Sequence, residues 1–470
     1  MPSINSLLSI ARSAIVAQQA AVEVAGHNIA NAQTPGYTRQ QLDVTPSTPL
    51  QTPTATYGTG VSIVNVSSVR DSLLDQEART QSAPAANYQA QSDLLGRVEG
   101  IFGEPSSDGL ASTIDAFWNS WSDLASNPAS ASAKTVVQQR GTMLAATFNQ
   151  YAKQLSDLSA STRSDAADAV KQANQITTQV AAINAQIVPA ESGGKSANDL
   201  RDQRDLLLDK LSQLVPVQVI NRADGSDQVM MGGMPLVDGS SAHALSLGGG
   251  LPLTLNRSGD PEALRAVGGK IGALLDAANT SLPNATASLD AIASSVITDV
   301  NALHEAGWSP PAGAAGNWNP ATPPTGSAVD FFDPAPAFGT AANIRLSATV
   351  ASDASSIAAG NALNAPGNNA TALAIAGLKD FSPSAPGNSI GGAYQALVAT
   401  VASAKSSADS SATVYDTLSK QAEQRRQSVS GVSTDEELIS LINHQQAYVA
   451  ASKLIQTVNE MSQALLDIKK

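Results

Sequence analysis

The chain has 470 residues, with 27 lysines and arginines against 40 aspartates and glutamates, so its net charge is -13. Charged residues make up 14% of it and aromatic residues only 4%, while hydrophobic residues reach 42%, a balance that favours long Ala- and Leu-rich helices over one large aromatic core. There is no cysteine and there are only four histidines. Disulfide scaffolds, thiol catalysis and cysteine-ligated metals are therefore excluded, and little remains for acid–base or metal chemistry.

Binding to nucleic acid or to a membrane is not expected either. An acidic chain without clusters of lysine and arginine is poorly suited to phosphate backbones. No continuous run of about 20 apolar residues occurs, which predicts that no segment spans a bilayer. The first residues, MPSINSLLSIAR, lack a basic region followed by an apolar core, so no ordinary secretory signal is expected.

Residues 1–32 predict an amphipathic helix whose apolar residues alternate in steps of four and three, as in a coiled coil. Gln18 is the interruption of this line. The apolar positions are Ile4, Leu8, Ala11, Ile15, Val22, Ala25 and Ile29. A type II turn is expected next, because Pro35 fixes the first corner and Gly36 supplies the positive φ at the second, just before Tyr37.

Between the termini the sequence predicts long amphipathic helices, because apolar residues recur at helical spacing. They cover residues 151–188, 198–214, 270–305 and 389–428. Pro189 is expected to end the first, and Pro283 to kink or break the third. The second is highly charged, and its polar side is expected to face solvent. The last, at about 40 residues, would be ~60 Å long, which is more typical of filaments and stalks than of enzymes.

Two stretches have a different pattern. Residues 216–266 alternate between apolar and polar positions around Gly-rich turns, as at Asp224 and Gly225, which predicts a small β region. Residues 306–388 are rich in Pro, Gly, Ala and Asn with scattered Trp and Phe, and they are expected to form loops and short strands.

The C-terminal segment predicts a second terminal helix. Gly431 should break the preceding helix, Ser433 or Thr434 should cap the new one, and the acidic residues 435–437 suit its first turn. Its apolar line also steps by four and three: Ala447, Ala451, Leu454, Val458, Met461, Leu465 and Ile468. Because neither terminal line has a partner in its own segment, we expect the two to pair with each other, with neighbouring subunits, or with both.

Motifs for catalysis and ligand binding are incomplete. Residues 387–391 (GNSIG) match the nucleophile-elbow pattern around Ser389, but the preceding FSPSAP cannot form the buried strand that this motif requires. Residues 194–196 (GKS) match the end of a phosphate-binding loop, but Pro189 stands at its first glycine. His27 and His444 are expected to be ordinary polar positions on the terminal helices. No catalytic, cofactor-binding or metal site is predicted.

Two motifs near the ends carry a family resemblance. Residues 28–40 (NIANAQTPGYTRQ) resemble the N-terminal signature of bacterial flagellar axial proteins, and residues 431–438 (GVSTDEEL) with 445–451 (QQAYVAA) are similar to the matching C-terminal signature. In the middle, residues 198–205 (NDLRDQRD) and 126–128 (SNP) resemble the flagellar hook-associated protein 1 family. The resemblance covers roughly residues 1–215, 265–305 and 389–470.

The resemblance implies a structural, non-enzymatic subunit at the junction of hook and filament. Its partners would be neighbouring copies in a ring, the hook protein, and hook-associated protein 3 on the distal side. It would leave the cytoplasm unfolded through the flagellar type III export apparatus, with a dedicated chaperone holding its C-terminal helix, and would reside outside the cell. Neither membrane, nucleic acid nor cofactor is implied.

The expected fold is mainly α with a smaller β-rich outer region, built on a long helical coiled-coil core from both termini and layered as in flagellin. Three domains are expected: a terminal coiled coil (1–50 and 431–470), a helical core (51–215, 267–305 and 389–430) and a β-containing outer domain (216–266 and 306–388). Assembly would use the two apolar lines together with Pro35, Gly36 and Tyr37. A secreted coiled-coil adhesin or stalk, another axial subunit such as a hook or second junction protein, and a hydrolase centred on Ser389 remain as alternatives.

Overall fold

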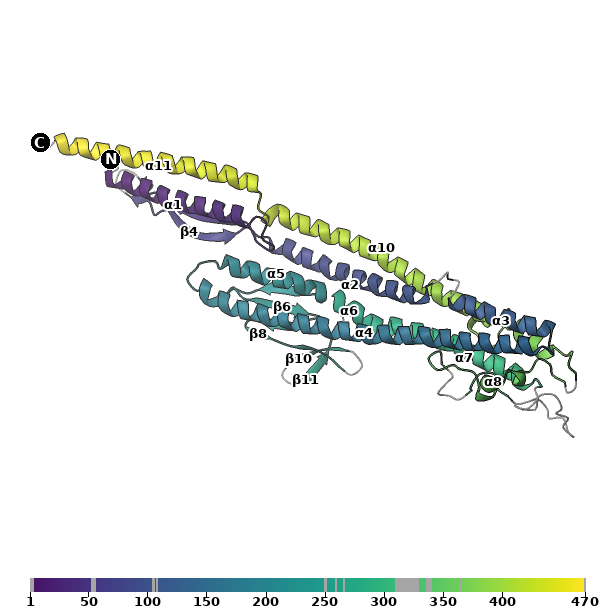
Figure 1. The fold of residues 1–470 in the computed structure, drawn as a ribbon. Coiled ribbons are helices and arrows are strands. Elements are labelled where there is room, and N and C mark those ends of the chain that lie inside the picture. Colours follow the sequence, from purple (N-terminus) through teal and green to yellow (C-terminus); the bar gives the residue numbers. More distant parts are fainter. Residues whose placement is uncertain are drawn as a thin grey trace. The chain divides into compact units, whose positions relative to one another are not determined.

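The structure is a computed structural model, and the chain divides into two compact units. Unit 1 comprises Met1–Asn87, Asp168–Gly272 and Ala412–Lys470, and unit 2 comprises Tyr88–Ala167 and Ala273–Ser411. Helices α2 (Ser72–Phe102), α4 (Ala131–Glu191) and α10 (Ile390–Ser430) contribute residues to both (Figure 1). The described residues are 4–51, 56–103, 106, 109–248, 252–257, 260–264, 267–308, 329–334, 340–362 and 365–468.

The two terminal helices pair within unit 1. Helix α1 (Ile4–Asn31) packs antiparallel against α11 (Thr434–Ile468), so the N-terminus lies near the C-terminal half of α11 (Figure 1). The two predicted terminal helices therefore pair with each other within one subunit. The buried side chains of α1 are mostly small, which permits close approach of the helices. They are Ala11, Ala17, Ala21, Ala25 and Asn28.

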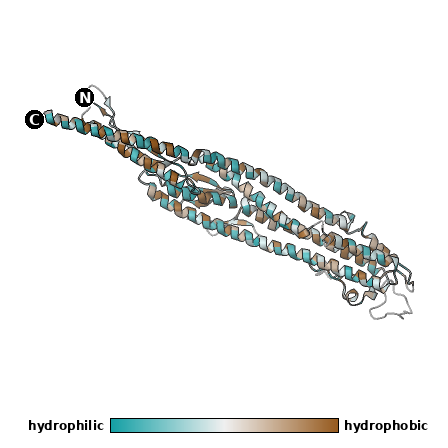
Figure 2. Cartoon of the chain, turned by 45° about the horizontal axis from the view of Figure 1, so that its top comes forward, coloured by the Kyte–Doolittle hydropathy of each residue, from teal (hydrophilic) through white to brown (hydrophobic). Residues whose placement is uncertain are grey.

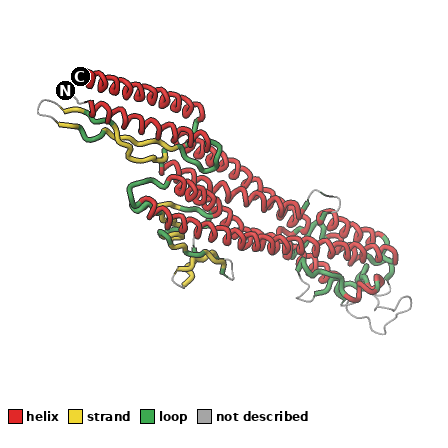
Figure 3. Tube along the Cα trace, turned by 60° about the vertical axis from the view of Figure 1, so that its left-hand side comes forward, coloured by secondary structure: helices red, strands yellow, loops and turns green. Residues whose placement is uncertain are grey.

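A β-hairpin that the sequence analysis missed follows α1. Its strands are β1 (Gln40–Pro46), β2 (Leu50–Gln51), β3 (Thr56–Tyr57) and β4 (Val61–Ser68). β1 pairs antiparallel with β4, and β2 with β3. We call residues 40–68 the hairpin arm. It packs on α1 (Figure 3), and Gly60, at φ +111°, allows this approach because a Cβ there would lie 2.2 Å from Ser13 Oγ.

The predicted small β region is confirmed beside α4 and α5 (Asn198–Leu214). Its strands form a four-stranded sheet in the order β5-β6-β7-β8 and a three-stranded sheet in the order β11-β10-β9. Gly225 has the positive φ expected of its first turn. The strands are β5 (Gln218–Asn221), β6 (Asp227–Met231), β7 (Met234–Asp238), β8 (Ser241–Ala242), β9 (Leu245–Leu247), β10 (Leu253–Arg257) and β11 (Asp260–Ala263).

Unit 2 is helical and concentrates the few aromatic residues in its core. Phe117 and Trp121 of α3 contact Phe331, with ring centroids 5.7 and 5.3 Å apart. Its remaining elements are α3 (Leu110–Ser126), α6 (Gly269–Asp276, which begins in unit 1), the π-helical η1 (Ala277–Ser281), α7 (Leu282–Glu305), α8 (Ala348–Ser352), η3 (Ala354–Ser356), α9 (Ala370–Gly377) and η4 (Pro386–Asn388).

The segment 306–388 differs from its expectation. It was expected to share an outer β domain with residues 216–266, but it belongs to unit 2. Its described part holds short helices and two isolated bridges, Trp308 with Gly360 and Phe332 with Leu346, in place of strands. The physical reason is that its aromatic side chains pack into the helical core. Trp318 and Phe338 lie outside the described residues.

The proline effects were predicted in part. Helix α4 begins at Ala131 and continues through Pro189 to Glu191, so it ends three residues after the expected end at 188, since proline disturbs only the last turn there. Pro283 stands at the start of α7, directly after η1, so the expected break takes the form of a π-helical turn.

Helix α1 is the element that bears on the expectation that no segment spans a bilayer. By length and composition it is the one helix, in the parts of the chain that the structure describes, that could cross a bilayer. Its two charged residues are Arg12 and Glu23. Helix α1 packs against both α11 and the hairpin arm, and part of its apolar surface stays exposed, as at Leu8 and Val16.

Candidate assembly site

The predicted line on α11 is partly covered by α1. Val458 is buried and Ala447 and Ala451 are half-buried, but Leu454 and Met461 are 39% and 46% exposed. The opposite flank of the same helix, through Leu441, Tyr448, Ile455 and Ser462, is half-buried instead. Leu465 and Ile468 belong to α11, but their side chains lie outside the described residues. Figure 2 shows hydrophobic and hydrophilic positions mixed along both terminal helices.

The predicted apolar line on α1 is also covered only in part. Ala11 is fully buried, Ile4, Ile15, Val22 and Ile29 are half-buried, and Leu8 is 38% exposed. Gln18, the interruption of the line, lies opposite His444, whose Nδ1 is 2.7 Å from Gln18 Oε1. Because an amide oxygen only accepts, His444 Nδ1–H is the donor of this bond.

The two family signatures meet at a polar cluster in which Asn28 and Glu437 are buried and Arg39 is half-buried, and we call these three residues the terminal clasp. Asn28, 1% exposed, donates from Nδ2 to Glu437 Oε2 (3.1 Å) and to Gln40 O (2.9 Å). Arg39 Nε donates to the other oxygen of Glu437 at 2.8 Å. Asn28 Oδ1 accepts from Gln40 N (3.0 Å) and from the Tyr37 hydroxyl (2.8 Å). The clasp therefore joins α1, β1 and the first turn of α11.

The predicted turn before the hairpin arm is confirmed. Tyr37 N donates to Thr34 O at 3.1 Å, and Gly36 has φ +80°. A Cβ on Gly36 would lie 3.1 Å from Leu206 Cβ, so the turn rests closely on α5. Pro35 and Gly36 are exposed and Tyr37 is half-buried. Burial raises the pKa of Tyr37, and nearby carboxylates raise it further.

The start of α11 also agrees with the prediction. Ser433 precedes the helix and accepts from Glu436 N at 3.5 Å, with the acidic residues 435–437 in the first turn.

The expectation that the charged side of α5 faces solvent is wrong. Asp202, Arg204 and Asp205 are 7%, 2% and 9% exposed. Positions 202, 205 and 209 follow the i, i+3, i+7 spacing of one helix face, and we call these three aspartates the acidic face of α5. The partners of this face lie at residues 38, 70, 79 and 426, too distant in sequence for the α5 pattern to reveal them.

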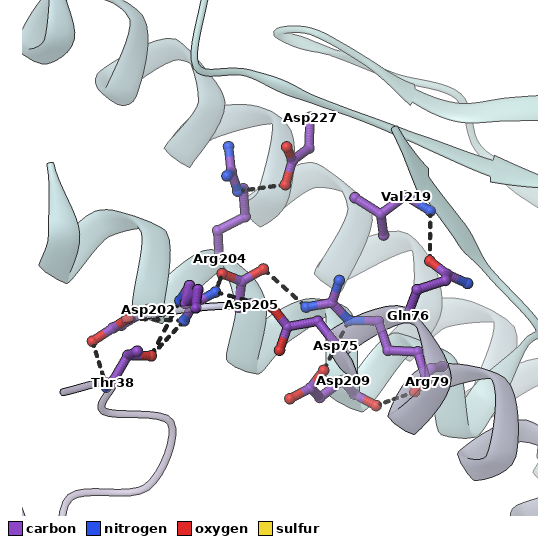
Figure 4. A network of polar contacts seen from close by, with 12 residues as sticks. Thr38, Asp75, Gln76, Arg79, Asp202, Arg204, Asp205, Asp209, Val219 and Asp227 are labelled. Atoms are coloured by element: carbon purple, nitrogen blue, oxygen red, sulfur yellow. Dashed lines mark hydrogen bonds and ion pairs between the residues drawn. The ribbon is translucent and has the colours of Figure 1, made fainter. Parts of the chain in front are cut away.

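Asp202 ties the signature turn to α5 (Figure 4). It accepts from Thr38 N at 3.0 Å and from Arg70 Nη2 at 2.9 Å, and Arg70 also donates to Thr38 Oγ1 at 2.7 Å. Burial raises the pKa of Asp202 despite these donors. The carboxylate is therefore a structural acceptor for the turn.

The other two aspartates of the acidic face hold neighbouring helices. Arg79 of α2 donates to Asp205 and to Asp209, each at 2.9 Å (Figure 4). Arg426 of α10 donates to Asp209 at 2.7 Å, and Arg70 forms an ion pair with Asp205. These pairs join α2, α10 and the segment between β4 and α2 to α5.

The remaining charge of α5 anchors the β region. Arg204 Nε lies 2.9 Å from Asp227 Oδ2, and Arg204 Nη1 donates to Asn184 Oδ1 (3.0 Å) and Gly225 O (2.8 Å). Burial lowers the pKa of Arg204 to about 10 and raises that of Asp227, so desolvation opposes both charges.

The incomplete motifs have structural roles. Ser389 Oγ accepts from Gly392 N at 3.2 Å and precedes α10, and the turn before it, η4, is not a strand. Ser196 bonds through its backbone N–H to Asn65, at 3.2 Å, in the linker between α4 and α5. Within the described ranges no group of three or more His, Cys, Asp and Glu is arranged to hold a metal ion.

Sequence models of flagellar protein families match the chain near both of its ends and in its central part. A sequence model of the flagellar hook-associated protein FlgK helical domain matches residues 95–317. A flagella basal body rod protein model matches residues 8–38, and one of the C-terminal part of the flagellar basal body rod FlgEFG proteins matches residues 423–468. The two rod-protein matches cover most of α1 and all of α11, which are the two helices that pair.

Whole-chain relatives carry one name. Flagellar hook-associated protein 1 of Bacillus subtilis (strain 168) is 28% identical over 500 residues, covering 97% of this chain and 96% of that protein. The protein of that name from Escherichia coli (strain K12) is 24% identical over 550 residues, covering 99% and 100%. The solved flagellar hook junction protein FlgK of Burkholderia pseudomallei shares the fold, with a TM-score of 0.63 at 20% identity, over 75% of this chain and all of that one.

These relatives are structural proteins of the flagellum. The chain belongs to the flagellar hook-associated protein 1 family and is a structural subunit of the bacterial flagellum at the junction between hook and filament.

Proposed function

We propose that the subunit assembles by burying the apolar side chains that its paired terminal helices leave exposed. In this proposal α11 and α1 pair within one subunit and pack side by side with the equivalent helices of neighbouring copies. The observation that carries it is the exposure of large aliphatic residues on helices already paired on another side. They are Leu8, Val16, Leu438, Ile439, Ile442, Val449, Leu454, Met461 and Leu466.

The energetics support contact between copies. Apolar surface gains about 25 cal/mol per Å² when it leaves water, so a fully buried Leu or Met side chain contributes roughly 1.5–3 kcal/mol. Several such residues on each subunit would stabilise a ring cooperatively. Scattered exposed apolar residues are ordinary, and others lie elsewhere on the chain, but a set gathered on two adjoining helices supports an interaction surface.

The finer partners follow from the family and the exposed helices. As a flagellar axial protein the chain assembles with other hook and rod components. We propose the hook protein on one side and hook-associated protein 3 on the distal side, with neighbouring copies completing a ring. Before assembly the apolar surface of α11 would be held by an export chaperone, and the chain would reach the cell exterior by type III export.

The test changes residues that the subunit itself does not bury. Leu454→Asp and Met461→Asp should each lower incorporation into flagella at least ten-fold, because each places a charge in the proposed contact. Gln456→Asp, on an exposed position of the same helix, is the matched control and should assemble normally. Immunogold electron microscopy of complemented deletion cells measures incorporation. Normal incorporation of both Leu454→Asp and Met461→Asp would contradict the proposal.

A further inference from the structure

We infer that the hairpin arm is a docking surface for α11 of a neighbouring copy of this chain. The part of α11 that docks is its exposed face at Leu438, Ile442 and Val449. The inference rests on the proposed assembly through the terminal helices. It assigns the surface that α11 of one copy contacts on the neighbouring copy. It concerns a segment that was not predicted from the sequence.

The arm exposes a compact aliphatic patch. Val44 is 51% exposed, Ile63 37% and Val64 62%. Val44 of β1 stands directly opposite Ile63 of β4, and Val64 is the additional residue of the bulge where the register shifts. Because paired residues of adjacent strands lie side by side and a bulge adds a neighbour, these three side chains form one surface.

A cavity continues this surface toward the helix pair. It has a volume of about 220 Å³ and lies among Leu42, Val44 and Val61 of the arm, Ala17 and Ala21 of α1, and Ser440 and His444 of α11. Val44 belongs to both the exposed patch and the cavity wall. Aliphatic and small side chains line the part of the cavity that adjoins the exposed patch at Val44, and polar or charged side chains line the rest: Gln18, Arg39, Gln40, Gln41 and Glu437, with Ser440 and His444.

The same chain carries a surface that fits. Leu438, Ile442 and Val449 follow the spacing i, i+4, i+11 on one face of α11, and they are 48%, 50% and 52% exposed. We call these three residues the outer face of α11. Like the patch on the arm, it is uncharged and aliphatic, so burying one against the other leaves no ionised group without a partner.

The symmetry of such a contact suits an axial structure. The arm and the outer face of α11 are different surfaces, so a contact between them in two copies is heterologous. Heterologous contacts leave one free surface of each kind at the ends, and they extend into rings or helical arrays instead of closing as a dimer. A two-stranded arm is also marginally stable alone, and covering it by a neighbour would stabilise it.

The first test uses cross-linking, since the chain has no cysteine of its own. Two differently tagged copies, one with Val64→Cys and one with Ile442→Cys, are expressed together in deletion cells, and isolated flagella are oxidised. A disulfide-linked heterodimer carrying both tags is expected, and a chain carrying both substitutions should give a ladder of oligomers. Leu73→Cys paired with Ile442→Cys is the control, because Leu73 is 79% exposed on α2 outside the patch. Cross-linking at Val64 no stronger than at Leu73 would overturn the inference.

The second test separates this inference from the function on which it rests. Val64→Asp should lower incorporation at least ten-fold while Leu73→Asp leaves it unchanged. If Leu454→Asp blocks assembly but Val64→Asp does not, the docking surface is wrong and assembly through the terminal helices stands. If both Leu454→Asp and Met461→Asp assemble normally, the proposed assembly itself fails.

Discussion

Asn28 connects the N-terminal and C-terminal signature residues, which lie at opposite ends of the sequence. Its amide makes four hydrogen bonds, to both backbone groups of Gln40, to the Tyr37 hydroxyl and to Glu437. An amide that is 1% exposed needs such partners, because a buried polar group left unpaired costs about 1–3 kcal/mol. The signature residues therefore act in joining α1, the hairpin arm and α11.

The two neighbouring acids of α11 provide a matched comparison at the clasp. Glu437, 3% exposed, pairs with Arg39 at 2.8 Å, whereas the side chain of Glu436 is 66% exposed and 3.4 Å from the same arginine. Glu437→Ala should lower the local stability of the helix pair by about 1–3 kcal/mol, since Asn28 and Arg39 lose an acceptor. Glu436→Ala should change it by less than about 0.5 kcal/mol. Amide hydrogen exchange in α1 and α11 of the purified subunit measures both, and equal effects would contradict the clasp.

His304 is a buried neutral histidine in unit 2 that the sequence did not single out. Its Nδ1 is 2.5 Å from Val329 O, and its Nε2 accepts from Ala358 N at 2.9 Å. The first contact requires a proton on Nδ1 and the second requires none on Nε2, which fixes the neutral tautomer. Burial, with a smaller contribution from the charge of Lys134, lowers the pKa of His304 to about 4.

Acid should destabilise unit 2 through this residue. The unfolded chain gains the histidine proton near pH 6.5 and the folded chain only near 4, so the contribution is complete above pH 6.5 and is lost as the pH falls through that window. The loss is on the order of 3 kcal/mol. Urea unfolding followed by tryptophan fluorescence reports on unit 2, which contains Trp118, Trp121 and Trp308. His304→Gln should flatten the profile between pH 6.5 and 4, and an unchanged slope would rule the explanation out.

At the scale of elements, α5 shows where sequence patterns are insufficient. Its boundaries, residues 198–214, were predicted correctly from helical spacing. The burial of its charges was not, because each aspartate of its acidic face is paired with an arginine from another element. A dense set of alternating Asp and Arg on one helix, in a chain with so few charges elsewhere, was the available signal.

The Arg204–Asp227 pair tests whether such charges serve stability or orientation. Arg204→Ala strands a buried carboxylate and should destabilise α5 and β6 by about 3–5 kcal/mol. Replacing both, with Arg204→Met and Asp227→Leu, should cost about 1 kcal/mol or less, because the desolvation of both charges is removed. Lys210→Ala, at an exposed position of α5, is the control. Amide exchange in β6 is the measurement, and a double variant as unstable as Arg204→Ala would contradict this account.

Whether each of the other elements could be predicted depended on whether the pattern that forms it is local in the sequence. The terminal helices, α10 and the β region were predicted because their periodicity is local. The hairpin arm was missed although β1 and β4 span seven and eight residues and β4 carries Val61, Ile63, Val64 and Val66. The segment 306–388 was missed because its packing depends on aromatic contacts with α3.

At the scale of the whole molecule, assembly follows from what the fold leaves uncovered. α1 and α11 bury one side of each other and keep aliphatic residues on the rest of their surfaces. The predicted lines on both helices were right in period, but Leu8, Leu454 and Met461 are exposed within the subunit. A line of apolar residues in the sequence identifies positions at which burial is favourable. Only the structure separates the side chains that are buried within the subunit from those that stay exposed for a partner.

The most direct test of the account is electron microscopy of cells that lack this gene, with flagellin measured in the medium and the gene restored as control. The account predicts hooks without filaments and flagellin released as monomer, with filaments returning on complementation. Intact filaments and normal swimming in the deletion cells would contradict a role at the junction between hook and filament.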